Sequence, residues 1–202
     1  MGMNEVVIPD AAALALEGIS VRLRACGGGL AVADAVELAS GLTLAAMHAG
    51  AVVLNLTPAE DLCVHDGRVT GVVVNRTGLE GALMVDPLCL RAQAVLDATG
   101  HEAALVKMLH RRGLGAAQRA PAEGAMDAEA GEAFVVEHAG EFHPGLWISG
   151  MCVAASLGGP RMGPIFGGML LSGMRAATLI DAALGAPHPR RPTSDPGECL
   201  ED

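Results

Sequence analysis

The 202-residue sequence predicts an α/β fold, and three observations favour it. Hydrophobic residues make up 51% of the chain and charged residues 18%, which is typical of a packed globular core. Two short apolar runs, 95–100 and 146–151, end in small residues, as buried strands do where they enter a turn. A long apolar helix is predicted at 164–184. We expect one domain over 1–185, followed by a disordered tail at 186–202 that is rich in proline and charge.

Short predicted elements surround one longer helix in the first part of the chain. Asp34 is a plausible N-cap for a helix that runs to His48, with Gly50 as its C-terminal stop. The apolar run 51–56 predicts a buried strand. The remaining elements predicted here are an extended segment at 4–8, a helical turn at 14–18, an extended segment at 21–25 and a glycine turn at 27–29.

A β-hairpin opens the second part of the chain. Asp66-Gly67 is a favoured two-residue turn, so 62–65 and 69–75 are predicted to pair as antiparallel strands. The elements predicted after it are a buried strand at 94–100, a helix at 102–112, a mobile loop at 113–131, strands at 134–137 and 145–151, and the final helix.

Composition excludes several classes of function. The formal charge of −10 argues against nucleic acid and acidic lipid as partners, and one Trp, three Phe and no Tyr leave no platform for base stacking. The most apolar stretch, 144–186, is interrupted by Arg161, Arg175 and Asp181, which argues against a membrane span. Five scattered cysteines without a C-x-x-C pair fit reduced thiols in the cytoplasm.

The block Pro160–Met169 carries the clearest functional signal. Arg161 stands just before the predicted helix, whose first N–H groups would point toward the same place as its guanidinium. Together with Gly163, Gly167 and Gly168, this arrangement predicts a site for a carboxylate or phosphate. A glycine-rich helix packed tightly on a sheet explains the same residues equally well.

Two strand ends resemble those of two-part FAD/NAD(P)-binding proteins. Val95-Leu96-Asp97-Ala98-Thr99-Gly100 resembles their "ATG" strand, and Pro144–Met151 resembles the later strand whose turn lies beside the dinucleotide pyrophosphate. Gly27-Gly28-Gly29 does not form the strand–GxGxxG–helix fingerprint of such proteins. We therefore expect a Rossmann-like FAD/NAD(P)-binding fold that lacks its N-terminal GxGxxG unit.

A more specific resemblance covers Gly2–Leu184. The chain resembles the thiamine thiazole synthase family, and within it the archaeal and bacterial sulfide-dependent ADP-thiazole synthases, some of which have been called ribose 1,5-bisphosphate isomerases. No isomerase base is visible in the sequence. The motifs that carry the resemblance are Asp86-Pro87, Asp97-Ala98-Thr99-Gly100-His101, Gly150-Met151, Pro160–Met169 and Leu171-Ser172-Gly173.

The resemblance implies an enzyme of the transferase class that forms an ADP-linked thiazole from NAD, glycine and sulfide. It implies Fe(II) as cofactor, held by Asp86 and His101, which would then be the catalytic residues. Arg161 would bind the glycine carboxylate, and the subunits would form a homo-octamer. The residues that would contact NAD, which serves as a substrate, are Pro58 through its backbone, Met84, Val85, Asp86 and Met151.

Residue types alone allow simpler roles for three of these positions. Asp86 before Pro87 is a turn cap in such sequences, His101 is a plausible cap for the next helix, and Met151 is a core residue.

Met84 departs from the family pattern, which has a sulfur-donating cysteine here in eukaryotic members and histidine in many archaeal ones. Methionine cannot donate its sulfur in that way, so free sulfide is the expected source. Two alternative functions stay open: a general flavin or NAD oxidoreductase, and a non-catalytic, N-terminally truncated remnant of the family.

Overall fold

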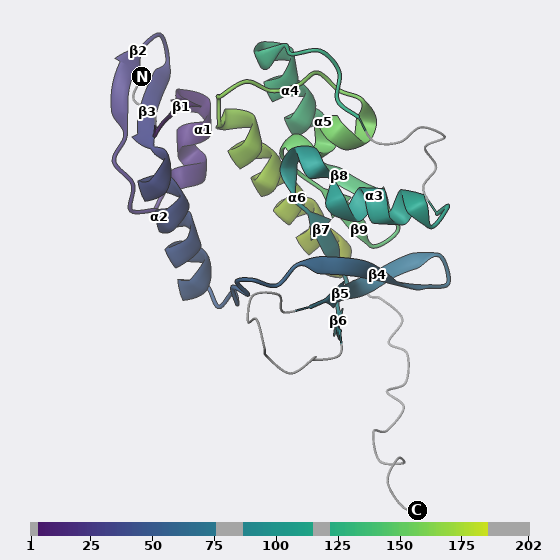
Figure 1. The fold of residues 1–202 in the computed structure, drawn as a ribbon. Helices are drawn as coiled ribbons and strands as arrows, with labels where there is room; N and C mark the ends of the chain where they lie inside the picture. The colour runs from purple at the N-terminus through teal and green to yellow at the C-terminus, as the bar shows by residue number, and fades with distance from the viewer. Residues whose placement is uncertain (1–3, 76–86, 115–121, 186–202) are drawn as a thin grey trace, which may run out of the picture.

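A computed structural model describes residues 4–75, 87–114 and 122–185, and shows a mixed α/β fold (Figure 1). The strands are β1 (Glu5–Pro9), β2 (Arg24–Gly27), β3 (Leu30–Asp34), β4 (Ala59–His65), β5 (Arg68–Val74), β6 (Leu88–Arg91), β7 (Val95–Asp97), β8 (Gly140–His143) and β9 (Leu146–Ile148). The helices are α1 (Asp10–Ala13), α2 (Ala35–His48), α3 (Ala104–Arg111), α4 (Ala128–His138), α5 (Met151–Leu157) and α6 (Gly167–Gly185), with 3-10 turns η1 (Leu14–Leu16) and η2 (Gly100–Glu102).

The strands in the described ranges form three three-stranded sheets, ordered β1-β3-β2, β4-β5-β6 and β7-β9-β8. The first two sheets are antiparallel. In the third, β7 and β9 run parallel, with Asp97 opposite Ile148. The carboxyl ends of β7 and β9 therefore lie at the same edge of the sheet, and the turns that follow them lead into η2 and α5.

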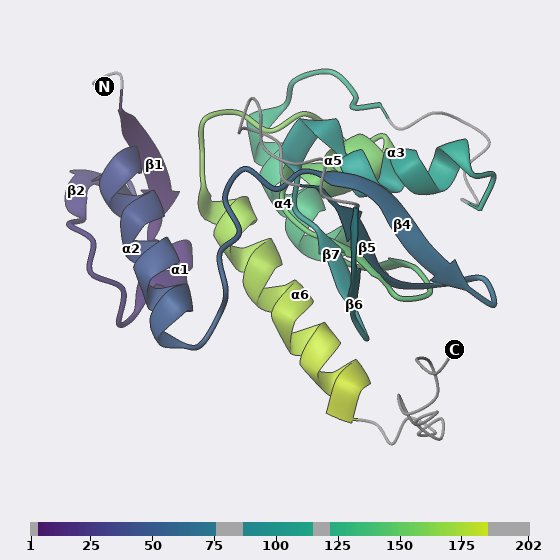
Figure 2. The same ribbon diagram turned by 60° about the horizontal axis from the view of Figure 1, so that its bottom comes forward.

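Helix α6 lies between two separate hydrophobic cores (Figure 2). The larger core fills the space around the β7-β9-β8 sheet and helices α3, α4 and α5. The smaller core lies under β1 and α1, and receives Phe166, Leu170 and Leu171 from the start of α6. The Phe166 N–H donates to the Val7 carbonyl at 2.9 Å, which ties β1 to the residue before α6. No helix in these ranges combines the length and apolarity that a membrane crossing needs.

Local sequence signals predicted several elements correctly. The Asp34 carboxylate accepts the N–H groups of Val36 and Glu37, both at 2.9 Å, and so caps α2 as predicted. The β4–β5 hairpin turns at Asp66 and Gly67 with φ angles of 49° and 71°, as a type I′ turn requires. Both signals act over only a few residues, which is why they hold without tertiary contacts.

The prediction of a buried strand at 51–56 is wrong. This segment belongs to no sheet of the described residues, and its side chains are exposed, with Val52 at 82% and Leu56 at 71%. Its apolar composition favours burial, but a strand also needs a neighbouring backbone to pair with. Within the described ranges no strand lies in register beside it.

The predicted strand at 134–137 is also wrong, because these residues lie within α4. The predicted loop at 113–131 extends too far, because α4 already begins at Ala128, and its residues 115–121 lie outside the described ranges. The Asp127 side chain accepts the Ala130 N–H at 3.1 Å and caps α4, whose buried Val135 packs in the larger core. A short apolar run does not by itself distinguish a strand from a buried helix. The predicted tail at 186–202 lies outside the described residues.

Candidate functional site

A buried aspartate shapes the turn at the end of β7. Asp97 is 0% exposed, and one carboxylate oxygen accepts the N–H and hydroxyl of Thr99 at 3.0 and 2.7 Å. The other oxygen accepts the N–H groups of Leu105 and Val106 at 2.8 and 3.0 Å. Asp97 thus joins β7 to the first turn of α3 and caps that helix. The sequence also allowed His101 as the cap of this helix, but Asp97 is the residue that caps it.

His101 lies in the η2 turn that Asp97 holds in place. Gly100 and Ala103 on either side have positive φ angles of 66° and 40°. The His101 side chain is 37% exposed, so it is presented at the surface of this turn. Met151, the first residue of α5, packs against the turn, with its terminal methyl 3.4 Å from where a Gly100 Cβ would be. The packing role of Met151 is confirmed, and its contact with NAD stays a prediction.

Arg161 is held by a second backbone segment. The Arg161 N–H donates to the Ala125 carbonyl at 3.0 Å, and its carbonyl accepts the Asp127 N–H at 3.1 Å. The Gly124 N–H donates to the Gly159 carbonyl at 2.8 Å. These bonds lay residues 124–127 alongside 159–161, while the Arg161 side chain itself stays 51% exposed.

Glu123 brings His101 and Arg161 together. One oxygen of its carboxylate is hydrogen-bonded to Nδ1 of His101, and the other lies 3.7 Å from Nε of Arg161. The Glu123 side chain is only 14% exposed. We call these three residues the His–Glu–Arg cluster. Sequence reasoning missed Glu123, which stood in a segment predicted as a loop, and no local pattern marks it.

The anion site predicted at the start of the last helix is filled by the protein's own carboxylate. Helix α6 begins at Gly167 rather than Pro164, and the Gly168 N–H donates to Oε2 of Glu132 at 2.5 Å. Burial raises the pKa of Glu132, and the Gly168 N–H partly opposes that rise. This helix end therefore already binds a carboxylate of the chain at Gly168, and its predicted assistance to Arg161 stays a prediction.

Close packing explains the two glycines at the start of α6. A Cβ on Gly167 would lie 2.8 Å from Cδ of Pro9, and one on Gly168 would lie 2.9 Å from Cγ2 of Val135. The alternative interpretation of the glycine block, tight helix packing, is confirmed for these two residues. Gly167 packs against the end of β1 and Gly168 packs against α4, whereas the sequence predicted packing on the face of a sheet.

The other predicted site residues lie elsewhere or outside the described ranges. Pro58 precedes β4, is exposed, and accepts the Asn75 N–H through its carbonyl at 3.1 Å, a bond that belongs to the β4–β5 hairpin. Met84, Val85 and Asp86 lie outside the described residues.

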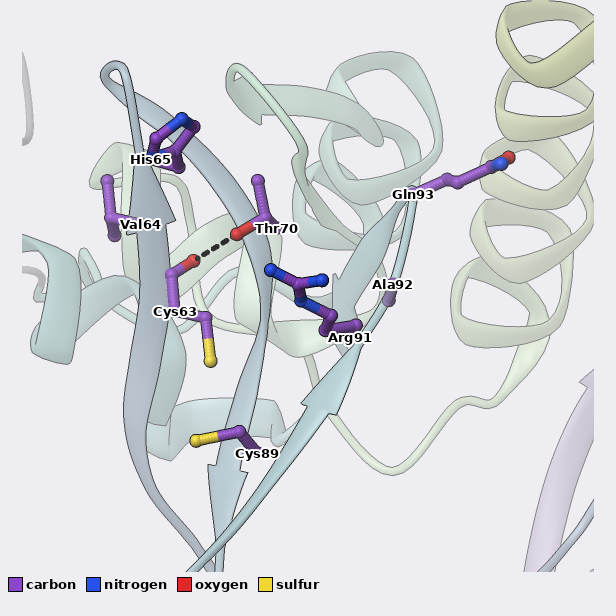
Figure 3. Close-up of a pocket in the computed structure, with 8 residues that line it drawn as sticks. All are labelled: Cys63, Val64, His65, Thr70, Cys89, Arg91, Ala92 and Gln93. Carbon is purple, nitrogen blue, oxygen red and sulfur yellow. Dashed lines mark hydrogen bonds between the residues drawn. The ribbon is translucent and has the colours of Figure 1, made fainter. Parts of the chain in front are cut away.

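A second candidate site is a pocket of about 730 Å³ on the β4-β5-β6 sheet. Cys63 of β4 and Cys89 of β6 point toward one another there across β5, with Arg91 on the same side (Figure 3). Burial and the nearby Cys89 thiol raise the pKa of Cys63. Over the described residues, no group of three or more His, Cys, Asp or Glu side chains is arranged to hold a metal ion. The lining residues are Cys63, Val64, His65, Thr70, Cys89, Arg91, Ala92 and Gln93.

Comparisons with known proteins agree on one family. The family model of the Thi4 family matches residues 1–166. The thiamine thiazole synthase of Thermococcus kodakarensis is 48% identical over 186 residues, which cover 92% of this chain and 73% of that protein. The thiamine thiazole synthase of Thermotoga maritima is 49% identical over 158 residues, covering 76% and 60%. The crystal structure of Thermovibrio ammonificans THI4 superposes with a TM-score of 0.83 at 38% identity, covering 91% of this chain and 74% of that one.

Proposed function

Because the chain belongs to the Thi4 family and functions in thiamine thiazole biosynthesis, we propose that it forms the ADP-thiazole from NAD, glycine and sulfide with Fe(II). The observation that carries this proposal is the convergence of His101 and Arg161 on one carboxylate. The reaction needs a metal ligand and a carboxylate-binding group side by side. These two residues, far apart in sequence, supply both types of group in one place.

The residues present fit an iron site. An imidazole nitrogen and a carboxylate oxygen, from His101 and Asp86, are ligands that suit Fe(II). The Nδ1 contact with Glu123 leaves Nε2 of His101 as the atom that would bind the metal. Bound Fe(II) would supply Lewis acidity and open positions for substrate atoms.

Arg161 suits the carboxylate of glycine. A guanidinium offers a planar fork of N–H donors that matches a carboxylate, and the Arg161 side chain is half exposed. Its contact with Glu123 at 3.7 Å is longer than a hydrogen bond, so the contact leaves N–H donors available to a ligand.

The same proposal includes NAD, sulfide and the oligomeric state. NAD would lie along Pro58, Met84, Val85, Asp86 and Met151, and the absence of a donor cysteine at Met84 supports free sulfide as the sulfur source. We also propose a homo-octamer in the cytoplasm. The exposed apolar residues of 51–56 support an assembly, because contiguous apolar surface is typical of subunit interfaces.

An anaerobic incubation of the protein with NAD, glycine, sulfide and Fe(II) tests the proposal. We expect release of nicotinamide and an adenylated thiazole, measured by chromatography and mass spectrometry, and no thiazole when glycine is omitted. A yellow protein with bound flavin and no thiazole would favour the oxidoreductase alternative. Absence of both product and calorimetric NAD binding would favour a non-catalytic member of the family.

A further inference from the structure

We propose that Glu123 is a positioning residue that couples the metal-binding and carboxylate-binding groups of this site. One carboxylate oxygen contacts Nδ1 of His101, and the other lies 3.7 Å from Nε of Arg161. This inference rests on the proposed function, because it assigns His101 to the metal and Arg161 to the substrate carboxylate.

The contact at Nδ1 selects one tautomer of His101. A carboxylate accepts hydrogen bonds and donates none, so the proton of a neutral imidazole in this contact resides on Nδ1. The lone pair is then on Nε2, which becomes the ligating atom. A carboxylate behind a histidine ligand also fixes the ring orientation.

The backbone around Glu123 is anchored to the segment that carries Arg161. Gly124, the next residue, bonds to Gly159, and the bonds at Ala125 and Asp127 continue the pairing past Arg161. A Cβ at position 124 would lie 3.2 Å from the Gly159 carbonyl, so glycine there permits the close approach. The same ladder thus sets the position of the Glu123 carboxylate and of Arg161.

The two contacts of Glu123 differ in kind. The His101 contact is a hydrogen bond, whereas the Arg161 contact at 3.7 Å is a charge attraction without a hydrogen bond. Glu123 therefore orients Arg161 while leaving the N–H donors that a substrate carboxylate would use. A single carboxylate with little exposure therefore contacts both groups.

Three variants separate these roles. Glu123→Ala removes both contacts, Glu123→Gln keeps an oxygen that can accept from Nδ1–H but loses the charge, and Glu123→Asp keeps the charge on a shorter side chain. Glu102→Gln is the matched control, because this carboxylate lies next to His101 in sequence but is 84% exposed and faces Lys107 at 4.0 Å.

The first readout is the tautomer of His101 in the metal-free protein. Nitrogen NMR of 15N-histidine-labelled protein, with His101 assigned from a His101→Asn variant, reports which ring nitrogen carries the proton. We expect Nδ1–H in the wild type and in Glu102→Gln. We expect a shift toward the Nε2–H form in Glu123→Ala.

The second readout is binding of Co(II), used anaerobically as a spectroscopic substitute for Fe(II). We expect Glu123→Ala to weaken Co(II) binding about 10–100-fold, the usual effect of losing a carboxylate behind a histidine ligand. We expect Glu123→Gln to bind Co(II) more tightly than Glu123→Ala but to show a raised KM for glycine. Glu123→Asp should restore part of both properties.

Unchanged tautomer and Co(II) affinity in Glu123→Ala would overturn the inference. So would wild-type protein that binds no Co(II), because His101 would then not be a metal ligand. If the wild type binds Co(II) but forms no thiazole, the proposed function fails, while the tautomer and affinity measurements still decide the role of Glu123.

Discussion

The His–Glu–Arg cluster and the cysteine pocket differ in how the fold makes them. The cysteine pocket has a volume of about 730 Å³, and all its lining residues come from β4, β5, β6 and the residues directly after β6. Its thiols face each other because their strands flank the same neighbour, β5, in the sheet. The His–Glu–Arg cluster instead contains one residue from each of three segments. The side chains of His101 and Arg161 both contact the carboxylate of Glu123. We base the proposed site on this convergence of complementary charges rather than on pocket volume.

Removal of Arg161 should have the largest effect on activity. Loss of a charge-assisted contact with a substrate carboxylate costs about 2–4 kcal/mol, so we expect Arg161→Ala to lower kcat/KM for glycine by ~30–1,000-fold. Steady-state kinetics of nicotinamide release measures this. Arg22→Ala is the control, because Arg22 is exposed and pairs with Glu37 far from the cluster. Equal activity of Arg161→Ala and Arg22→Ala would show that Arg161 does not bind the substrate.

Removal of Asp97 should have the largest effect on stability. Asp97→Ala leaves the N–H groups of Leu105 and Val106 without their acceptor in a buried position, which costs about 3 kcal/mol or more. Urea unfolding measures the loss. Asp181→Ala, an exposed position on α6, should change stability by less than about 0.5 kcal/mol. A small effect at Asp97 would mean that the β7 turn does not depend on this carboxylate.

The pH dependence of stability should reveal Glu132 at the start of α6. Burial raises the folded-state pKa of Glu132 above its unfolded value, so its stabilising contribution is complete below the unfolded pKa. That contribution is lost as the pH rises through the folded pKa. We expect Glu132→Gln to remove this loss, and therefore to gain stability relative to the wild type as pH rises. Thermal unfolding of both proteins across the acidic range tests the sign, and parallel curves would contradict it.

The cysteine pocket should show the smallest effect. We expect the double variant Cys63→Ser, Cys89→Ser to keep thiazole formation within about twofold of the wild type and to lose less than about 1 kcal/mol of stability, because Cys89 is exposed and Cys63 only half-buried. Kinetics and urea unfolding measure the two. A loss of activity comparable to that of Arg161→Ala would place chemistry in the pocket and reverse the comparison of the two regions.

Several elements of the fold, and two of the three residues of the His–Glu–Arg cluster, could be predicted from the sequence. The cap at Asp34, the turn at Asp66-Gly67 and the strands around 95–97 and 146–148 follow from signals that act between near neighbours. His101 was found through the motif resemblance, whereas Arg161 was predicted from its place before the last helix and then also by the resemblance. The buried charge of Asp97 was present in the same motif, and a carboxylate in an apolar strand is itself a signal that partners must exist.

Tertiary contacts decided the rest. The apolar segment 51–56 is not a strand, because within the described residues no neighbouring strand receives its backbone bonds. Residues 134–137 became helical through the Asp127 cap and packing in the core, where their composition alone suited either structure. The predicted start of α6 shifted because Glu132, from another helix, supplies the capping carboxylate.

The sequence by itself determined the local caps and turns, the apolar runs that form the core, and the chemical groups available to the site. Only the tertiary structure decided that Glu123 joins His101 to Arg161 and that Glu132 fills the helix end where a ligand was expected. The physical reason is the separation along the chain of the residues that interact. Caps and turns depend on backbone geometry within a few residues, whereas a carboxylate's partners depend on which distant segments the folded core brings within hydrogen-bond distance.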